Sequence, residues 1–126
     1  TFAVWGLSFK PDTDDMRESP SITIAEYLNE QGAVVRGYDP VAMDNAKRMM
    51  PFIEMMKNPY ELVTDADAVI VMTPWNEFKN LDMNRIKESM KTPVLIDGRN
   101  LYEPTVMRDF GFDYCAIGRG YNGSGK

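Results

Sequence analysis

The stretch that most constrains the fold is A-V-I-V-M-T at residues 68–73, which is apolar at almost every position and shows no alternation. A half-buried strand alternates apolar and polar residues, whereas a strand that is apolar on both faces lies inside a sheet covered on both sides. The sequence therefore predicts a central, parallel strand with helices packed above and below it.

Short apolar runs alternate with segments of helical period along the rest of the chain. This pattern predicts strands at residues 2–5, 33–38, 52–55, 68–73, 94–96 and 114–117. It predicts helices at residues 21–31, 41–50, 59–64, 81–90 and 104–110. Ser19 and Pro20 suit the start of the first helix, and Gly32 and Gly111 suit the ends of two of them. We therefore expect an α/β, Rossmann-like domain: a doubly wound, mainly parallel sheet of five or six strands with helices on both faces.

Composition excludes several classes of protein. A length of 126 residues suits one domain with its own core. With no histidine and one cysteine, the chain has neither a Ser-His-Asp triad nor a zinc site of the usual kind. We expect a cytoplasmic protein, because a single thiol forms no internal disulfide. We expect no membrane and no nucleic acid as partners, since no apolar run approaches about 20 residues and the net charge is -5.

Cations follow three of the predicted strands. Ligands of doubly wound sheets bind beyond the carboxyl ends of the strands, where this sequence places Lys10, Arg99 and Arg119. The connection at residues 6–19 is longer than the roughly 2 to 6 residues usual for such loops, which is typical of a functional loop. Two cations that converge there, Lys10 and Arg99, would form an anion site, and a diphosphate would fit it.

Two strings resemble binding motifs but lack the context that each motif needs. The acidic run from residue 12 has Arg17 where a calcium loop has glycine, and Thr23 where it has glutamate. Residues 118–123 match G-x-G-x-x-G, yet three residues follow and no helix can start there. After the first strand only Gly6 is present, so we expect that the domain does not hold a dinucleotide by itself.

Cys115 and Trp75 can each be explained by packing in the core as well as by a functional role. Cys115 falls within the last predicted strand, where we interpret it as a small buried hydrophobic residue. Trp75 follows the central strand, where it could stack on a ligand or a neighbouring subunit, or pack in the core.

Five blocks of sequence resemble, in order, the C-terminal domain of the nucleotide-sugar dehydrogenases, the UDP-glucose/GDP-mannose dehydrogenase family. The blocks are GLSFKPDTDDMRESP at residues 6–20, YDP at 38–40, TPWNEF at 73–78, DGRNLY at 97–102, and GFDY at 111–114 followed by GR at 118–119. The resemblance implies that residues 1–120 are a UDP-sugar-binding domain, with a tail at residues 121–126. It also implies that the chain is one part of a longer, homodimeric enzyme.

The resemblance also implies an activity for that longer enzyme, the oxidation of UDP-glucose to UDP-glucuronate with two NAD. By motif position, Phe9, Lys10 and Arg99 would contact the UDP-sugar, and Arg17 would reach NAD. The NAD-binding domain and the catalytic cysteine would lie in the rest of the chain, so no catalytic residue and no metal ligand is expected here. The fragment alone is expected to be inactive.

Two alternatives remain open at this point. One is the same domain of a sister enzyme that acts on UDP-N-acetylmannosamine or GDP-mannose. The other is a receiver-like signalling module, which is also doubly wound. Asp14 and Asp15 could mimic the acidic pair of a receiver, but the late strand ends carry Arg99 and Arg119 where a receiver needs lysine.

Overall fold

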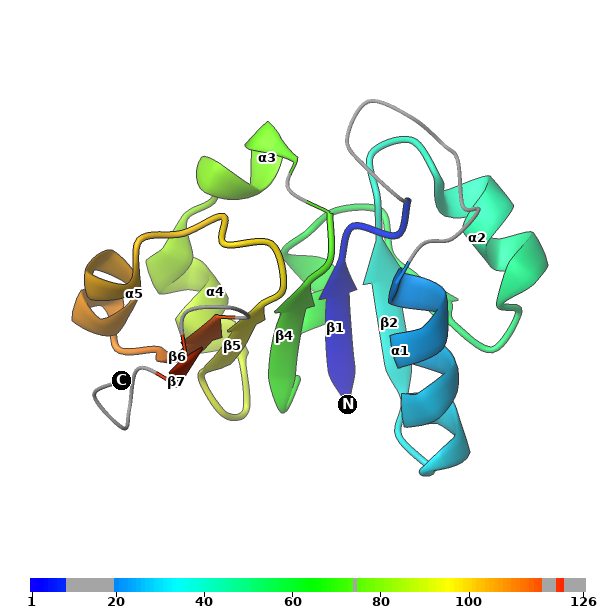
Figure 1. Ribbon diagram of the computed structural model, residues 1–126, viewed down its shortest axis with the longest axis horizontal. Helices are drawn as coiled ribbons and strands as arrows, with labels where there is room; N and C mark the ends of the chain where they lie inside the picture. The colour runs from blue at the N-terminus through cyan, green and yellow to red at the C-terminus, as the bar shows by residue number, and fades with distance from the viewer. Residues whose placement is uncertain (9–19, 74, 117–119, 122–126) are drawn as a thin grey trace.

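The computed structural model describes residues 1–8, 20–73, 75–116 and 120–121 (Figure 1). Within these residues, seven strands form one sheet in the order β3-β2-β1-β4-β5-β6-β7. The strands are β1 (Phe2–Trp5), β2 (Val35–Tyr38), β3 (Glu54–Met55), β4 (Ala68–Val71), β5 (Val94–Asp97), β6 (Asp113–Ala116) and β7 (Gly120–Tyr121). Strands β1 to β6 are parallel, and β7 pairs with β6 in the antiparallel sense.

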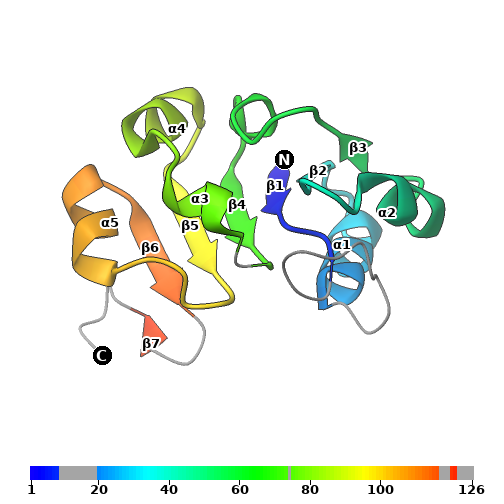
Figure 2. The ribbon, with the colours of Figure 1, turned by 90° about the horizontal axis from the view of Figure 1, so that it is seen from above.

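Helices lie on both faces of the sheet. They are α1 (Pro20–Glu30), α2 (Met43–Met49), the 3-10 helix η1 (Glu61–Val63), α3 (Asn76–Lys79), α4 (Met83–Ser89) and α5 (Pro104–Phe110). Figure 2 shows α1 and α4 on opposite sides of the strands. The expected doubly wound α/β fold with a mainly parallel sheet is confirmed, and six of its strands are parallel.

The element boundaries differ from the sequence prediction in a few places. Four elements, β2, β3, α2 and α4, begin two residues later than expected, and β4 ends two residues earlier. The helix expected at residues 59–64 is a single 3-10 turn. Helix α3 and strand β7 are additional elements. Their lengths of 4 and 2 residues are too short to show a hydrophobic period, which is why the pattern did not reveal them.

Each face of the sheet has its own core. On the face of α3, α4 and α5, the rings of Trp5 and Phe78 stack with centroids 5.4 Å apart. On the other face, Val4 packs with residues of α1 and α2 such as Ala25 and Ala46. All four residues of β4 are buried, as the apolar run at its centre predicts. The strand order places β4 beside β1, where the direction of winding changes.

Helix ends follow local sequence signals. Asp82 caps α4 through its side chain, which accepts a hydrogen bond from the backbone N–H of Arg85 at 3.2 Å. Helix α5 begins at Pro104 and ends at Gly111, whose φ of 98° is left-handed, as the sequence predicts. No helix in the described part of the chain is long and apolar enough to cross a membrane.

Candidate functional site

The carboxyl ends of β1, β2, β4 and β5 meet at one edge of the sheet, at the top of Figure 1. A parallel sheet brings the residues that follow its strands together at such an edge. The described residues there include two buried carboxylates, Asp39 after β2 and Asp97 at the end of β5. They also include Arg99, the one predicted site residue that the structure describes.

Asp39 ties the ends of three strands together. Its Oδ2 accepts hydrogen bonds from the backbone N–H groups of Leu7 at 2.8 Å and Ser8 at 3.1 Å, and from the Ser8 hydroxyl at 3.2 Å. The indole N–H of Trp75 donates to the same oxygen at 3.3 Å. The other carboxylate oxygen, Oδ1, accepts hydrogen bonds from the backbone N–H groups of Val41 and Ala42, which follow Asp39 in the sequence. Both oxygens of this fully buried side chain thereby have hydrogen-bond partners.

Gly6 allows the end of β1 to approach the end of β4 closely. Its φ is 89°, and a Cβ at this position would lie 2.6 Å from the backbone N of Thr73. The hydroxyl of Thr73 donates to the backbone carbonyl of Ser8 at 2.7 Å, just beyond the glycine. Both the left-handed conformation and the lack of space require glycine here.

Three of the predicted site residues, Phe9, Lys10 and Arg17, lie outside the described residues. Both ends of the segment that contains them are described. Ser8 is held by Asp39 and Thr73, and the hydroxyl of Ser21, in the first turn of α1, donates to the carbonyl of Leu7 at 2.6 Å. The segment therefore starts and ends at the carboxyl edge of the sheet.

Asp97 holds the turn that carries Arg99. It is fully buried, and its Oδ2 accepts from the hydroxyl of Tyr114 at 2.7 Å and from the N–H of Tyr102 at 2.9 Å. Its Oδ1 accepts from the N–H of Arg99 at 3.0 Å. Gly98 lies between Asp97 and Arg99, and its backbone N–H donates to the carbonyl of Val71 at 2.9 Å. A Cβ on Gly98 would crowd the same carbonyl oxygen. The turn therefore lies directly against the end of β4.

The Arg99 side chain extends from this turn toward the middle of the edge. Its Nη1 donates to the backbone carbonyl of Met72, which follows β4, at 3.1 Å. The side chain is exposed overall, so the guanidinium lies at the surface of the edge and is not buried in the core. A guanidinium held in this way presents a planar fork of N–H donors, which matches the oxygens of a phosphate.

Two tyrosines near the edge are held in their neutral form. Burial, Asp97 and Tyr114 raise the pKa of Tyr102, whose hydroxyl donates to the carbonyl of Phe78 at 2.6 Å. Burial and the neighbouring carboxylate of Glu77 raise the pKa of Tyr38, whose hydroxyl donates to Glu77 at 2.9 Å. Both hydroxyls therefore act as hydrogen-bond donors that brace the edge.

The structure decides between the interpretations of Trp75 and modifies that of Cys115. Trp75 is 8% exposed and donates to Asp39, so it packs in the core. Cys115 lies in β6 as expected, but it is only partly buried. In the sequence, Asp39 and Asp97 stand only within the YDP and DGRNLY blocks, and neither was given a role. The signal that could have found them is an aspartate directly after a buried strand, because a carboxylate buried there needs several hydrogen-bond donors nearby.

A family model describes the same stretch of chain. Residues 3–104 match the UDP-binding domain of the UDP-glucose/GDP-mannose dehydrogenase family. The chain belongs to this family, and the matched part is its UDP-binding domain.

Individual relatives agree with the family match. The chain is 48% identical to a UDP-glucose 6-dehydrogenase of Rhizobium meliloti over 117 residues, which are 93% of this chain and 27% of that protein. It is 44% identical to a UDP-glucose 6-dehydrogenase of Pseudomonas aeruginosa, over 94% of this chain and 28% of that protein. The chain thus spans about a quarter of the length of the curated relatives it matches.

Solved structures share the fold over nearly the whole chain. An NDP-N-acetyl-D-galactosaminuronic acid dehydrogenase of Methanosarcina mazei is 32% identical with a TM-score of 0.81, over 95% of this chain and 25% of that one. A UDP-D-ManNAc dehydrogenase of Pyrococcus horikoshii is 34% identical with a TM-score of 0.74, over 94% of this chain and 25% of that one.

Proposed function

We propose that this chain is the UDP-sugar-binding domain of a UDP-glucose 6-dehydrogenase, a longer enzyme that oxidises UDP-glucose to UDP-glucuronate with two NAD. The observation that carries the proposal is the position of Arg99. Its guanidinium is held by the carbonyl of Met72 at the edge where the segment of residues 9–19 starts and ends. A substrate diphosphate at this edge would meet Arg99 and any cation of that segment.

We assign the contacts of the UDP-sugar to Phe9, Lys10 and Arg99. Lysine and arginine suit a diphosphate because both are cationic, and arginine adds a planar fork of donors. An aromatic ring such as that of Phe9 suits the apolar parts of a nucleotide sugar. We assign Arg17, later in the same segment, to a contact with NAD.

The described residues do not fit the main binding site of a dinucleotide. A dinucleotide-binding fold uses a glycine-rich turn after its first strand and an acidic residue that binds the ribose. Here the turn after β1 has Gly6 followed by a buried Leu7, and Asp39 is turned inward onto backbone N–H groups. We therefore place most of the NAD site in another part of the longer enzyme, and derive no step through NAD in this domain.

The role of the domain is to bind and position the substrate. The chain contains no histidine, and its one cysteine lies in β6, so we assign the catalytic nucleophile to the rest of the enzyme. Binding energy from a diphosphate far from the reacting carbon raises the rate only where it orients that carbon productively. We also expect the whole enzyme to be a homodimer.

The choice of UDP-glucose over another nucleotide sugar follows the similarity of the relatives. The curated relatives at 48% and 44% identity are named as UDP-glucose 6-dehydrogenases, which supports UDP-glucose. Among solved structures, a UDP-glucose dehydrogenase and a UDP-D-ManNAc dehydrogenase are similar to this chain to nearly the same degree, 33% and 34%. A UDP-N-acetylmannosamine or GDP-mannose dehydrogenase is the alternative that the binding experiment must exclude.

Calorimetric titration of the chain with UDP, UDP-glucose, UDP-N-acetylmannosamine and GDP-mannose tests the proposal, and tighter binding of UDP-N-acetylmannosamine than of UDP-glucose would favour the first alternative. We expect weak binding of UDP and UDP-glucose, weaker binding of GDP-mannose, and no turnover with NAD. Arg99→Ala should weaken UDP binding by about 10- to 100-fold, the value of a charge-assisted hydrogen bond. Arg108→Ala is the matched control, because Arg108 is an exposed arginine on α5.

Two results would contradict the proposal. If Arg99→Ala and Arg108→Ala bind UDP equally well, Arg99 is not a substrate residue. If GDP-mannose binds best, the substrate is another nucleotide sugar.

In the full-length enzyme, Lys10→Ala and Arg99→Ala should each raise the KM for UDP-glucose strongly.

A further inference from the structure

Strands β5 and β6 are covered on one face and open on the other. In β5, Leu95 and Asp97 are buried on one face, whereas Val94 and Ile96 on the opposite face are only partly buried. In β6, Tyr114 and Ala116 are buried, and Cys115 on the opposite face is partly exposed. Strands of a parallel sheet normally lie beneath a layer on each face. One layer is therefore missing over this half of the sheet in the described part of the chain.

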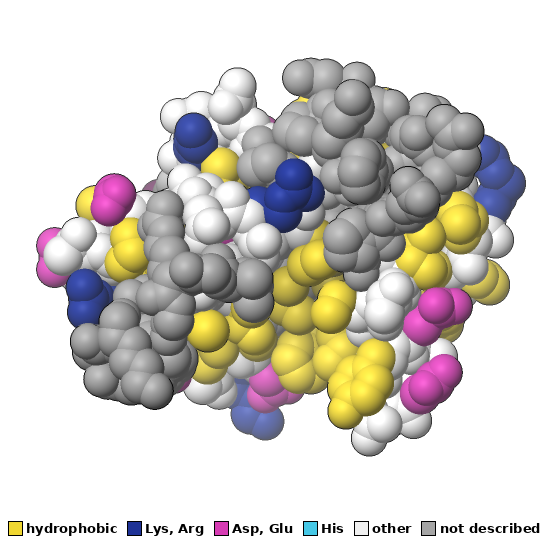
Figure 3. Space-filling model, viewed as in Figure 1, with side chains coloured by type: hydrophobic (Ala, Val, Ile, Leu, Met, Phe, Trp, Pro, Cys, Tyr) yellow, Lys and Arg dark blue, Asp and Glu magenta, His cyan; other side chains and the backbone are white. Residues whose placement is uncertain are grey.

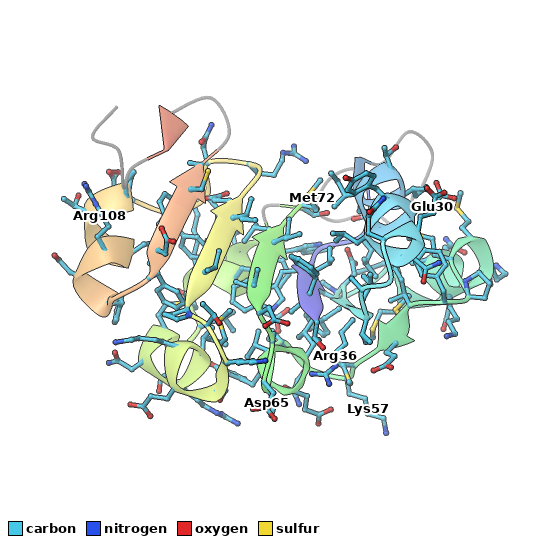
Figure 4. All side chains as sticks on the ribbon, turned by 90° about the horizontal axis from the view of Figure 1, so that it is seen from below. Glu30, Arg36, Lys57, Asp65, Met72 and Arg108 are labelled. Carbon is cyan, nitrogen blue, oxygen red and sulfur yellow. The ribbon has the colours of Figure 1, made fainter. Side chains whose placement is uncertain are left out.

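The topology explains why the described connections leave this face open. The helices that follow β4 and β5, namely α3, α4 and α5, all pack in the core that contains Leu95 and Tyr114. Helices α1 and α2 pack on the other face, but against Val4 and Val35 of β1 and β2. Figure 4 shows α4 and α5 on one side of β4, β5 and β6, with α1 set to one end of the opposite side.

The open face forms an apolar groove beside α1. The groove has a volume of about 440 Å³. Its lining includes Phe2, Ile70 and Ile96 of the sheet, Met72 directly after β4, and Ile24 and Tyr27 of α1. Figure 3 shows hydrophobic side chains gathered in one continuous area there. Tyr27 is 60% exposed and Ile24 is 37% exposed, although both belong to the lining. Contiguous exposed apolar surface of this kind marks an interaction site.

We propose that this groove is the docking site of an apolar helix face from the same polypeptide, from a part of the longer dehydrogenase that lies outside residues 1–126. The relatives at 48% and 44% identity match nearly all of this chain with only 27% and 28% of their own length, so the greater part of such an enzyme lies elsewhere. A tethered segment meets the groove at an effective concentration of the order of millimolar, which favours it over a separate molecule.

The lining defines the chemistry of the contacting stripe. The lining is apolar apart from Gly98 and Arg99. A helix whose contacting stripe carries large aliphatic or aromatic side chains, and no charge, would therefore complete the layer. Packed helices lie about 8–10 Å apart, so a single helix layer is the element that fits beside α1.

The docking site is connected to the substrate site through Met72. The Met72 side chain lines the groove, and its backbone carbonyl accepts the hydrogen bond from Arg99 Nη1. A helix in the groove would therefore pack against the residue that holds the proposed substrate arginine. The inference shares one premise with the proposed function, that the chain is a domain of a longer dehydrogenase.

Site-specific photo-cross-linking in the full-length enzyme tests the proposal. Tyr27 is replaced by the photoreactive amino acid p-benzoylphenylalanine, which keeps the phenyl ring of tyrosine and carries a benzoyl group at the para position. Val106, an apolar residue of α5 with 45% exposure, is replaced in the same way as the control. Denaturing gels separate intrachain from interchain products, and peptide mass spectrometry identifies the cross-linked segment.

We expect the Tyr27 variant to give an intrachain cross-link to an apolar helical peptide outside residues 1–126, and the Val106 variant to give none. An interchain cross-link at Tyr27 would show that a second copy occupies the groove and would overturn the proposal. The absence of any cross-link at Tyr27 would overturn it too, because the groove would then be open to solvent.

Thermal unfolding gives a second, independent measurement. Tyr27→Glu should lower the Tm of the full-length enzyme and leave that of the 126-residue chain unchanged, since Tyr27 is exposed in the chain alone. Val106→Glu should leave both unchanged. An equal effect of Tyr27→Glu on the two proteins would contradict docking.

Assays of the same samples separate the two proposals. A cross-link in an enzyme that does not bind UDP-glucose would leave the docking site standing and refute the function. An enzyme that oxidises UDP-glucose but gives no cross-link at Tyr27 would support the proposed function and refute the docking site.

Discussion

The carboxylate of Asp39 accepts two hydrogen bonds from Ser8, one from its backbone N–H at 3.1 Å and one from its hydroxyl at 3.2 Å. One buried side chain at the end of β2 thereby fixes the residue from which the long segment of residues 9–19 departs. The position of Ser8 therefore depends on a carboxylate that points onto the backbone N–H groups of Leu7 and Ser8.

Asp39→Asn should destabilise the domain by about 1–3 kcal/mol. The amide group puts N–H donors opposite the N–H donors that now bind the carboxylate, so buried polar groups lose their partners. Urea unfolding measures the change. Asp109→Asn is the control, because Asp109 is exposed on α5 and its replacement should stay within about 0.5 kcal/mol. Equal effects of the two substitutions would show that Asp39 is not a structural hub.

Gly6→Ala should cost clearly more stability than Gly32→Ala. The two glycines have nearly the same left-handed φ, 89° and 88°. A Cβ on Gly6 would crowd Thr73, whereas a Cβ on Gly32 would meet nothing within 4 Å. The loss of stability in Gly32→Ala therefore measures the cost of a left-handed backbone conformation alone, about 1–2 kcal/mol. The additional loss in Gly6→Ala measures the steric cost of the close approach of β1 and β4. Equal losses in denaturant unfolding would mean that the crowding is relieved cheaply.

Tyr114→Phe should weaken both stability and UDP binding. The substitution removes the hydroxyl that donates to Asp97 Oδ2 at 2.7 Å and leaves a buried carboxylate oxygen with fewer partners, at a cost of about 1–3 kcal/mol. Because Asp97 also holds the N–H of Arg99, the turn that carries this arginine should shift. Calorimetry with UDP checks the second effect. Tyr27→Phe, at an exposed tyrosine, should change neither quantity, and an unchanged UDP affinity in Tyr114→Phe would separate Asp97 from the binding site.

Alkaline pH should destabilise the domain through Tyr38 and Tyr102. The folded state raises the pKa of both hydroxyls above the ordinary value of 10.0, so the unfolded chain releases their protons first. The stabilisation from the neutral hydroxyls is complete below pH 10 and falls as the pH rises above it toward the folded pKa. Unfolding measured at successive pH values, with the ultraviolet absorbance of tyrosinate, follows the change. Tyr102→Phe should reduce the slope, and an unchanged slope would contradict the assignment.

The fold could be predicted in large part because its signals are local. The apolar run that forms β4 is buried on both faces, and Gly111 ends α5 in a left-handed conformation, as each residue type indicates. Helix α3 and strand β7 escaped prediction, since 4 and 2 residues are too few for a period. The predicted place of Arg99 at the carboxyl edge agrees with the structure, but the contact with Met72 depends on how β4 and β5 align.

By itself, the sequence determined which residues are apolar, where the chain turns and which side chains follow each strand. These properties belong to single residues and their neighbours, so they determine the α/β alternation and the edge of the sheet that carries Arg99. Only the tertiary structure decided that Asp39 points inward onto the backbone of Leu7 and Ser8. It also decided that Leu95 is buried while Ile96, its equally apolar neighbour, faces an open groove. The physical reason is that hydrophobicity favours burial without specifying the partner, and the handedness of the crossovers determines which face the chain covers.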